Sequence, residues 1–213
     1  MRFGIFIYPG VEPIDLATFG VLSMARRVAP FIEIVTIAPV AGQVPFSNGL
    51  KVVADYGIAD APDCAIVIVT GGPGWVAQAA DQATLRYIRE TAKTSKVASV
   101  CTGAMILAAS GALDGLHATT KRAVVPPEEQ PLTVMRQTYP AIMVVESSLV
   151  DGPVITGGGV SLCIDATLHI IAKMIGADIA RETARIIEYD RAWQANLTGF
   201  PPRLIDEAAL EAV

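Results

Sequence analysis

Four short runs of apolar residues, rich in Val and Ile, alternate with longer segments of helical pattern. The runs are Phe3–Tyr8, Ile32–Ala38, Cys64–Val69 and Val97–Val100. They are apolar on both faces, which is typical of strands that helices cover on both sides of a sheet. Helices are expected at about Ile14–Arg27, Gln82–Lys93, Val160–Met174 and Ile179–Asp190. This alternation predicts an α/β fold, a three-layer αβα sandwich with a mostly parallel central sheet.

The segment Gly115–Pro153 departs from this alternation. It contains two short β-type runs, Ala141–Val145 and Ser148–Val150, and a proline-rich stretch, Pro126–Pro131. We interpret it as an insertion or a β-rich flank within the same domain. Because the chain shows no internal repeat and no linker, residues 1–213 are predicted to form one domain.

Composition excludes several function classes. The 213 residues carry 16 Lys and Arg against 21 Asp and Glu, a formal net charge of −5, so neither nucleic acid nor an anionic membrane is an expected partner. The hydrophobic fraction of 52% is enough for a large core. The longest uncharged stretch, Val97–Leu113, is interrupted by Ser, Thr and Gly and falls short of the ~20 apolar residues that span a bilayer. A soluble globular protein is therefore expected.

Cysteine and histidine usage indicates a reducing compartment and no metal site. The three cysteines, Cys64, Cys101 and Cys163, cannot all pair within one chain. Two histidines without a Cys/His cluster argue against zinc. The amino-terminal residues run directly into an apolar strand without a signal-peptide pattern, so a cytoplasmic location is expected.

Reactive residues matter most where they follow a strand, because ligands of open α/β sheets bind beyond the carboxyl ends of the strands. Cys101 stands between a buried strand and a helix of small and apolar residues. Backbone N–H groups and the helix dipole at such a turn would stabilise a thiolate, and Gly103 and Ala104 would permit a sharp nucleophile elbow. Cys64 and Cys163 lie within apolar segments and are expected to be buried structural thiols.

Two further segments follow strands. The glycines Gly71 and Gly72 come after Val69, where their N–H groups could form an oxyanion hole, although a plain Gly/Pro turn explains them equally well. A match to a dinucleotide fingerprint over 72–77 is weak, because no acidic residue ends a following strand. Asp15 follows the first strand at a helix start; spacing alone favours a helix cap, whereas a catalytic carboxyl would need to meet Cys101 across the sheet.

The long helix near the end of the sheet offers weaker signals. The glycines of Thr156–Gly159 are best explained by close helix–sheet packing, since no Lys-Ser/Thr pair follows to complete a P-loop. Asp165, His169 and Lys173 recur every four residues and favour a hydrogen-bonded structural stripe over a polar site. His117 is expected on the surface near a strand start.

Several motifs recur together in order and carry a family resemblance. They are Tyr8–Asp15, Thr70–Gly74, Val100–Ala104, Leu113–Gly115 with Ala118–Thr120, and Thr156–Val160 followed by Ile164–Asp165. Over roughly residues 1–202, the chain resembles the ThiJ/PfpI superfamily, which has a flavodoxin-like, class I glutamine amidotransferase-like fold. It is most similar to the isonitrile hydratase subgroup and to the ligand-binding halves of AraC-type regulators.

The resemblance implies Cys101 as nucleophile, Asp15 as its acid/base partner, and an oxyanion pocket from the Gly72 and Thr102 amides. It also implies a homodimer and no cofactor. Thr102 stands where protease-like members have His, which argues against a Cys-His protease or glutaminase. Because the chain given ends at Val213, no helix-turn-helix domain is expected.

Two departures bear on the substrate. Ala17–Gly20 replaces a Gly-Pro pair usual in the subgroup, and Lys121-Arg122 replaces a His-Trp pair. Two cations near the pocket would favour an anionic substrate or lower the thiol pKa. The leading hypothesis is a cysteine-dependent hydratase that converts a small electrophile, an isonitrile, to an N-substituted formamide. A glyoxalase-type enzyme, a cysteine-based redox sensor and a plain small-molecule binding module are the alternatives.

Overall fold

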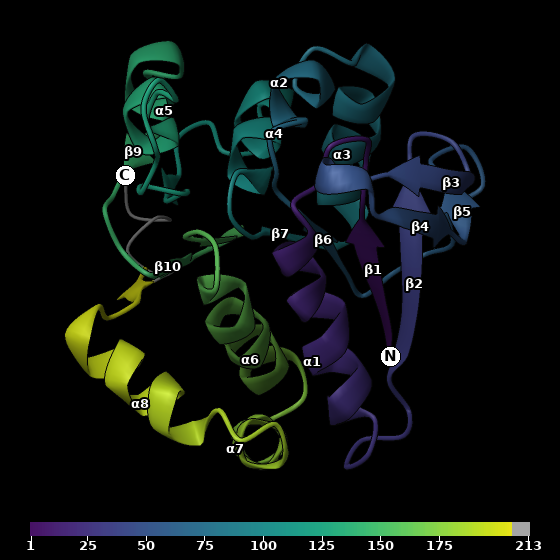
Figure 1. Ribbon diagram of the computed structural model, residues 1–213, viewed down its shortest axis with the longest axis vertical. Helices are drawn as coiled ribbons and strands as arrows, with labels where there is room; N and C mark the ends of the chain where they lie inside the picture. Colours follow the sequence, from purple (N-terminus) through teal and green to yellow (C-terminus); the bar gives the residue numbers. More distant parts are fainter. Residues whose placement is uncertain (206–213) are drawn as a thin grey trace.

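A computed structural model describes residues 1–205, and it contains the expected mostly parallel sheet flanked by helices (Figure 1). The strands of the eight-stranded sheet are β1 (Arg2–Phe6), β2 (Glu33–Ala38), β5 (Tyr56–Gly57), β6 (Ile66–Val69), β7 (Lys96–Ser99), β10 (Leu149–Asp151), β11 (Ile155–Gly157) and β12 (Arg203–Leu204). Their spatial order is β12-β10-β11-β7-β6-β1-β2-β5, and only the β10–β11 pair is antiparallel. The predicted fold class is confirmed.

Two groups of helices cover the sheet. The first contains a 3₁₀ turn η1 (Pro13–Leu16), α1 (Ala17–Ala25), α6 (Leu162–Met174), α7 (Ala177–Ile186) and α8 (Asp190–Gly199). The second contains α2 (Trp75–Gln78), α3 (Gln82–Thr94), α4 (Gly103–Ser110) and α5 (Pro131–Thr138). Helix α1 packs against α6 and α7, whereas α4 packs against α2, α3 and α5. Central strands β1 and β6 are therefore buried on both faces, as their continuous apolar sequences predict.

Several predicted elements differ in detail. The helix expected at Ile14–Arg27 begins as the 3₁₀ turn η1 and becomes α-helical only from Ala17. The helix expected at Ile179–Asp190 is two helices, with Asp190 starting α8. A hairpin of β3 (Gly42–Pro45) and β4 (Lys51–Ala54), joined through the short turn η2 (Ser47–Gly49), was not predicted.

The β-rich interpretation of Gly115–Pro153 is only partly right. Strands there are short: β8 (His117–Ala118) pairs with β9 (Met143–Val144), and β10 joins the main sheet. Between them lies α5, which the sequence analysis did not predict. Its first residue, Pro131, suits the first turn of a helix because the missing N–H needs no partner there.

No helix among residues 1–205 is long and apolar enough to cross a membrane. One continuous apolar core runs through the described part of the chain. A single domain over residues 1–213 stays a prediction, and residues 206–213 lie outside the described range.

Candidate active site

The ends of three adjacent strands converge on one site. Strands β7, β6 and β1 are neighbours in the sheet, and their carboxyl ends lead into Cys101, Gly71 and Asp15 respectively. The chain runs outward from β1 to β2 on one side and from β6 to β7 on the other. The β1/β6 boundary is therefore the switch point at which open α/β sheets bind ligands.

Cys101 occupies a sharp turn between β7 and α4. Its φ of 52° is unusual for a residue with a side chain. The turn is held by two hydrogen bonds: the Cys101 N–H donates to the Gly158 carbonyl at 3.0 Å, and the Thr120 hydroxyl donates to the Cys101 carbonyl at 2.9 Å. A side chain at Gly103 would place its Cβ 2.1 Å from the Val69 carbonyl oxygen, so only glycine lets α4 start this close to β6. The elbow expected from sequence is present.

Asp15 does not cap its own helical turn. No side chain caps η1, and Asp15 Oδ2 instead accepts a 2.6 Å hydrogen bond from the Gly71 N–H in the loop after β6. The side chain is fully buried, and its Oδ1 has no hydrogen-bond partner among the described residues. The cap interpretation is therefore wrong: tertiary packing carries the carboxyl inward towards the loop that adjoins Cys101.

Burial and mutual repulsion set the protonation of Asp15 and Cys101, which we call the Cys101–Asp15 pair. Burial, with a smaller contribution from Glu12, raises the pKa of Asp15 to about 7, although the Gly71 hydrogen bond opposes the shift. Burial and the Asp15 charge raise the pKa of Cys101 to about 12, against the Thr102 hydrogen bonds and the Lys121 charge. The expected low thiol pKa is wrong, because the helix start does not offset the desolvation of sulfur. Near neutral pH, the thiol is therefore protonated and the Asp15 carboxyl is partly ionised.

Thr102 forms hydrogen bonds with the glycine loop that follows β6. Its hydroxyl accepts a 2.8 Å hydrogen bond from the Gly72 N–H and contacts the Gly72 carbonyl at 3.3 Å. Gly72 has a φ of 143°, and a Cβ there would lie 2.2 Å from the Glu12 nitrogen, so glycine is required. The Gly72 amide is thus occupied by Thr102, and an oxyanion role for it, which stays a prediction, requires the Thr102 hydroxyl to turn away.

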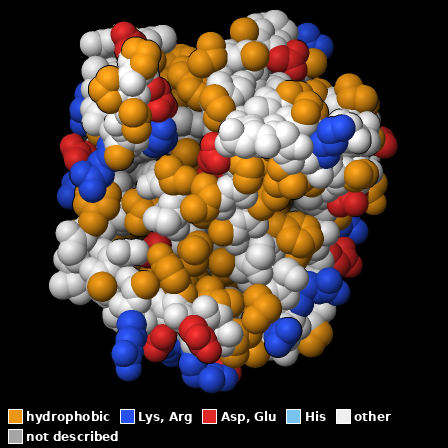
Figure 2. All heavy atoms as spheres, in the orientation of Figure 1, with side chains coloured by type: hydrophobic (Ala, Val, Ile, Leu, Met, Phe, Trp, Pro, Cys, Tyr) orange, Lys and Arg blue, Asp and Glu red, His pale blue; other side chains and the backbone are white. Residues whose placement is uncertain are grey.

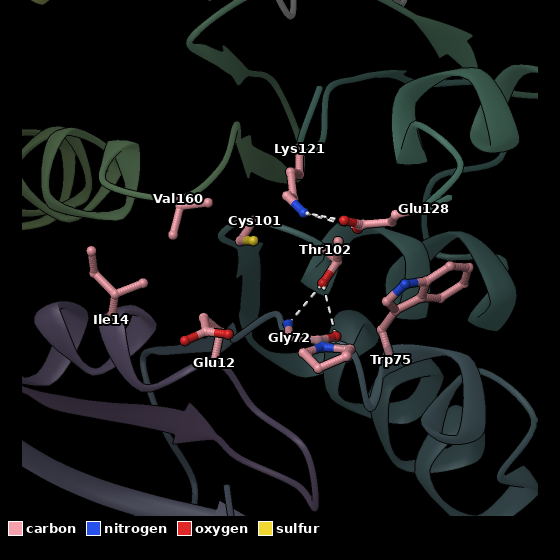
Figure 3. Close-up of a pocket in the computed structure, with 10 residues that line it drawn as sticks. Glu12, Ile14, Gly72, Trp75, Cys101, Thr102, Lys121, Glu128 and Val160 are labelled. Atoms are coloured by element: carbon pink, nitrogen blue, oxygen red, sulfur yellow. Dashed lines mark hydrogen bonds and ion pairs between the residues drawn. The ribbon is translucent and has the colours of Figure 1, made fainter. Parts of the chain in front are cut away.

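A cavity of about 460 Å³ opens beside the Cys101 thiol (Figure 3). Its lining residues are Glu12, Ile14, Gly72, Pro73, Trp75, Cys101, Thr102, Lys121, Glu128 and Val160. Trp75, Glu128 and Val160 were not predicted to belong to the site. Glu128 in particular lies in the proline-rich stretch, and no local pattern indicates that this stretch folds back over the pocket.

The two cations after Thr120 make different contacts. Lys121 lines the pocket, but its ammonium forms a 2.9 Å ion pair with Glu128. Arg122 pairs with Glu146 at 3.2 Å, stacks over the Phe200 ring and is not among the lining residues. The two cations therefore do not favour an anionic substrate, because each is compensated by a glutamate.

The polar residues of helix α6, which were expected to have a structural role, bond to other side chains. His169 and Lys173 both contact Asp151, at 2.8 and 2.5 Å, whereas Asp165 accepts a 2.9 Å hydrogen bond from Tyr189. They do not form one polar site. A Cβ at Gly157 would lie 2.9 Å from the Ala166 Cβ, which confirms the packing role expected for that glycine.

The remaining cysteines and histidine are partly or wholly enclosed. Cys64 and Cys163 are buried free thiols, as expected. His117 begins β8 and is half-buried rather than fully on the surface. Tyr8, which the sequence analysis did not weigh, is fully buried near the pair; burial and the charges of Asp15 and Cys101 raise its pKa.

Residues 2–173 match the sequence profile of the DJ-1/PfpI family. The chain belongs to this family. Among curated relatives, isonitrile hydratase of Pseudomonas putida is 30% identical over 191 residues, which cover 89% of this chain and 78% of that protein. The HTH-type transcriptional regulator GbdR of Pseudomonas aeruginosa is 26% identical, and the match covers 70% of this chain but only 39% of the regulator.

Solved structures show the same family fold. A ThiJ/PfpI family protein from Pseudomonas syringae superposes with a TM-score of 0.76 at 26% identity, covering 89% of this chain and 75% of that one. DJ-1beta of Drosophila melanogaster gives a TM-score of 0.73 at 19% identity, covering 88% and 97%, a likeness of fold alone. Family membership is therefore clear, and the relatives include both an enzyme and regulators.

Proposed function

We propose that this DJ-1/PfpI protein is a cysteine-dependent, cofactor-free hydratase that adds water to an isonitrile and releases an N-substituted formamide. The observation that carries the proposal is the Cys101 thiol on the wall of the pocket, with the buried Asp15 carboxyl held nearby by the Gly71 amide. The similarity to isonitrile hydratase along 89% of the chain supports this reaction class.

In the first step, the thiol adds across the terminal carbon of the isonitrile. The Cys101 proton passes to Asp15 and then to that carbon while sulfur forms the S–C bond, which gives a thioimidate. A carboxyl with a pKa of about 7 suits both halves of this transfer, because it accepts and releases a proton near neutral pH. The Thr102 amide, which hydrogen-bonds the sulfur, steadies charge as it develops there.

In the second step, water attacks the thioimidate carbon. Asp15 accepts one proton from this water and passes it to the substrate nitrogen as the hydroxyl adds to carbon, and it then takes the hydroxyl proton of the tetrahedral adduct. The S–C bond then breaks, the sulfur recovers its proton from Asp15, and the formamide leaves. The sum is one isonitrile and one water to one formamide, with no oxidant or cofactor consumed.

The test is formamide production from an alkyl isonitrile, followed by mass spectrometry. We expect turnover by the wild type and by Cys64→Ser, whose thiol is buried outside this pocket, and none by Cys101→Ser. A Cys101 that alkylates without formamide production would exclude the hydratase and favour the glyoxalase or sensor hypothesis. Location in the cytoplasm, assembly as a homodimer and the lack of a nucleic-acid partner stay predictions.

A further inference from the structure

Glu12 places a carboxylate on the pocket wall. It is half-buried and lies just after β1, three residues before Asp15. Within residues 1–205, its side chain has no hydrogen bond or ion pair, and its charge contributes to raising the pKa of Asp15. A half-buried carboxylate that repels its neighbour and forms no ion pair in the described part of the chain is a group available to a ligand.

The other charges of the pocket do not compensate Glu12. Besides Cys101, the lining residues that titrate are Glu12, Lys121 and Glu128, and the last two neutralise each other in their 2.9 Å ion pair. Two carboxylates against one ammonium leave a net negative charge on the wall, and any ionised fraction of Asp15 adds to it. A concave site of one sign concentrates ligands of the opposite sign.

Apolar side chains line the same part of the pocket as this carboxylate. In Figure 3, Ile14 and Val160 stand on the same side of Cys101 as Glu12, whereas the Lys121–Glu128 pair and Trp75 lie on the other side. A short alkyl chain would contact Ile14 and Val160 while its charged end reaches Glu12. This arrangement of an apolar wall and one placed charge is typical of small-molecule sites.

We propose that Glu12 makes this pocket selective for cationic substrates, in which a short alkyl chain joins an ammonium group to the carbon that Cys101 attacks. The inference rests on the proposed function for the identity of the reacting group. The preference for a cation rests only on the charges of the wall, and binding can test it without turnover.

The experiment compares two isosteric isonitriles, a trimethylammoniopropyl compound and its neutral analogue with carbon in place of the quaternary nitrogen. We expect kcat/KM of the wild type to favour the cation about fivefold, the size of a partly exposed ion pair. Glu12→Gln should abolish the preference, and Glu12→Asp should keep it. Glu146→Gln is the matched control, because it removes the same charge from a residue that pairs with Arg122 and does not line the pocket.

A second arm measures binding of the two corresponding formamides to Cys101→Ser in a Trp193→Phe background, by fluorescence of Trp75 on the pocket wall. Tighter binding of the cationic formamide, lost in Glu12→Gln, supports the inference even if no isonitrile is hydrated. Equal binding of both compounds, or an equal loss in Glu12→Gln and Glu146→Gln, overturns it. Turnover of both isonitriles at the same rate overturns the cation preference and leaves the hydratase standing.

Discussion

The amide of Gly71 donates a 2.6 Å hydrogen bond to the buried carboxyl of Asp15. The same residue adjoins the elbow on its other side, where a Cβ would lie 2.8 Å from the Cys101 Cβ and 2.4 Å from the Thr102 nitrogen. One glycine therefore positions the acid and leaves room for the nucleophile.

Gly71→Ala should destabilise the protein and abolish Cys101 chemistry. The nearest atom is the Thr102 backbone nitrogen, which cannot move aside cheaply, so we expect a loss of about 1–3 kcal/mol or more in the free energy of unfolding. Gly20→Ala is the matched control: a Cβ there meets nothing within 4 Å, and Gly20 lies inside α1. It should stabilise by about 0.5–1 kcal/mol. Urea denaturation of both variants checks this, and equal effects would contradict it.

The stability of the protein should fall between about pH 4 and pH 7 because of Asp15. Its pKa is raised on folding from 3.8 to about 7, so the folded state binds the proton more tightly. The resulting stabilisation is complete below the pKa of Asp15 in the unfolded chain and is lost as pH rises through its pKa in the folded protein. Across this range, the free energy of unfolding changes by up to about 4 kcal/mol. Asp15→Asn should lack this component when urea denaturation is repeated across the pH range. An unchanged pH dependence in Asp15→Asn would show that the carboxyl titrates normally.

Turnover should increase with pH through about 7. The proposed first step needs one proton on the Cys101–Asp15 pair, so protonation of Asp15 at lower pH removes the acceptor for the thiol proton. Asp15→Asn should lose this rising limb and reduce kcat/KM by about 10²–10⁴. The measurement is kcat/KM for an alkyl isonitrile from pH 5 to 9. A rate that instead falls above pH 7 would mean that the doubly protonated pair is the active form.

Alkylation of Cys101 should respond to Asp15→Asn in the opposite direction to turnover. Burial and the Asp15 charge raise the pKa of the thiol to about 12, so alkylation of the wild type should still be accelerating above pH 9. Removing the carboxylate charge lowers the thiol pKa, and iodoacetamide should then react faster at pH 8. Intact mass in a Cys64→Ser, Cys163→Ser background isolates Cys101. Slower alkylation in Asp15→Asn would show that the carboxylate acts as a base in the free protein.

Thr102→Val should leave the Gly72 amide without its 2.8 Å partner. Because the amide is buried, the loss should cost about 1–3 kcal/mol of stability. Thr102→Ser keeps the hydroxyl and should retain both stability and turnover. Thermal denaturation and formamide production are measured on both variants. The comparison distinguishes the effect of losing the hydroxyl, in Thr102→Val, from the effect of losing the methyl group, in Thr102→Ser. A Thr102→Val protein as stable as Thr102→Ser would show that the hydroxyl is not needed to hold the glycine loop.

The sequence by itself determined the fold class and the elbow. Apolar runs such as Ile66–Val69 have no polar face and must be covered on both sides, which leaves few arrangements other than a parallel sheet between helices. Cys101 could be singled out because a nucleophile between a buried strand and a helix start depends only on local order in the chain. The motifs around Cys101, in their order along the chain, were enough to identify the family.

Only the tertiary structure decided how the site is charged. Spacing favoured Asp15 as a helix cap, but its carboxyl bonds Gly71, which lies 56 positions away along the chain. Lys121 and Arg122 indicated an anionic pocket ligand until Glu128 and Glu146 were found beside them. Protonation and net pocket charge depend on burial and on partners distant in sequence, because electrostatic energy follows distance in space and desolvation follows the surrounding fold.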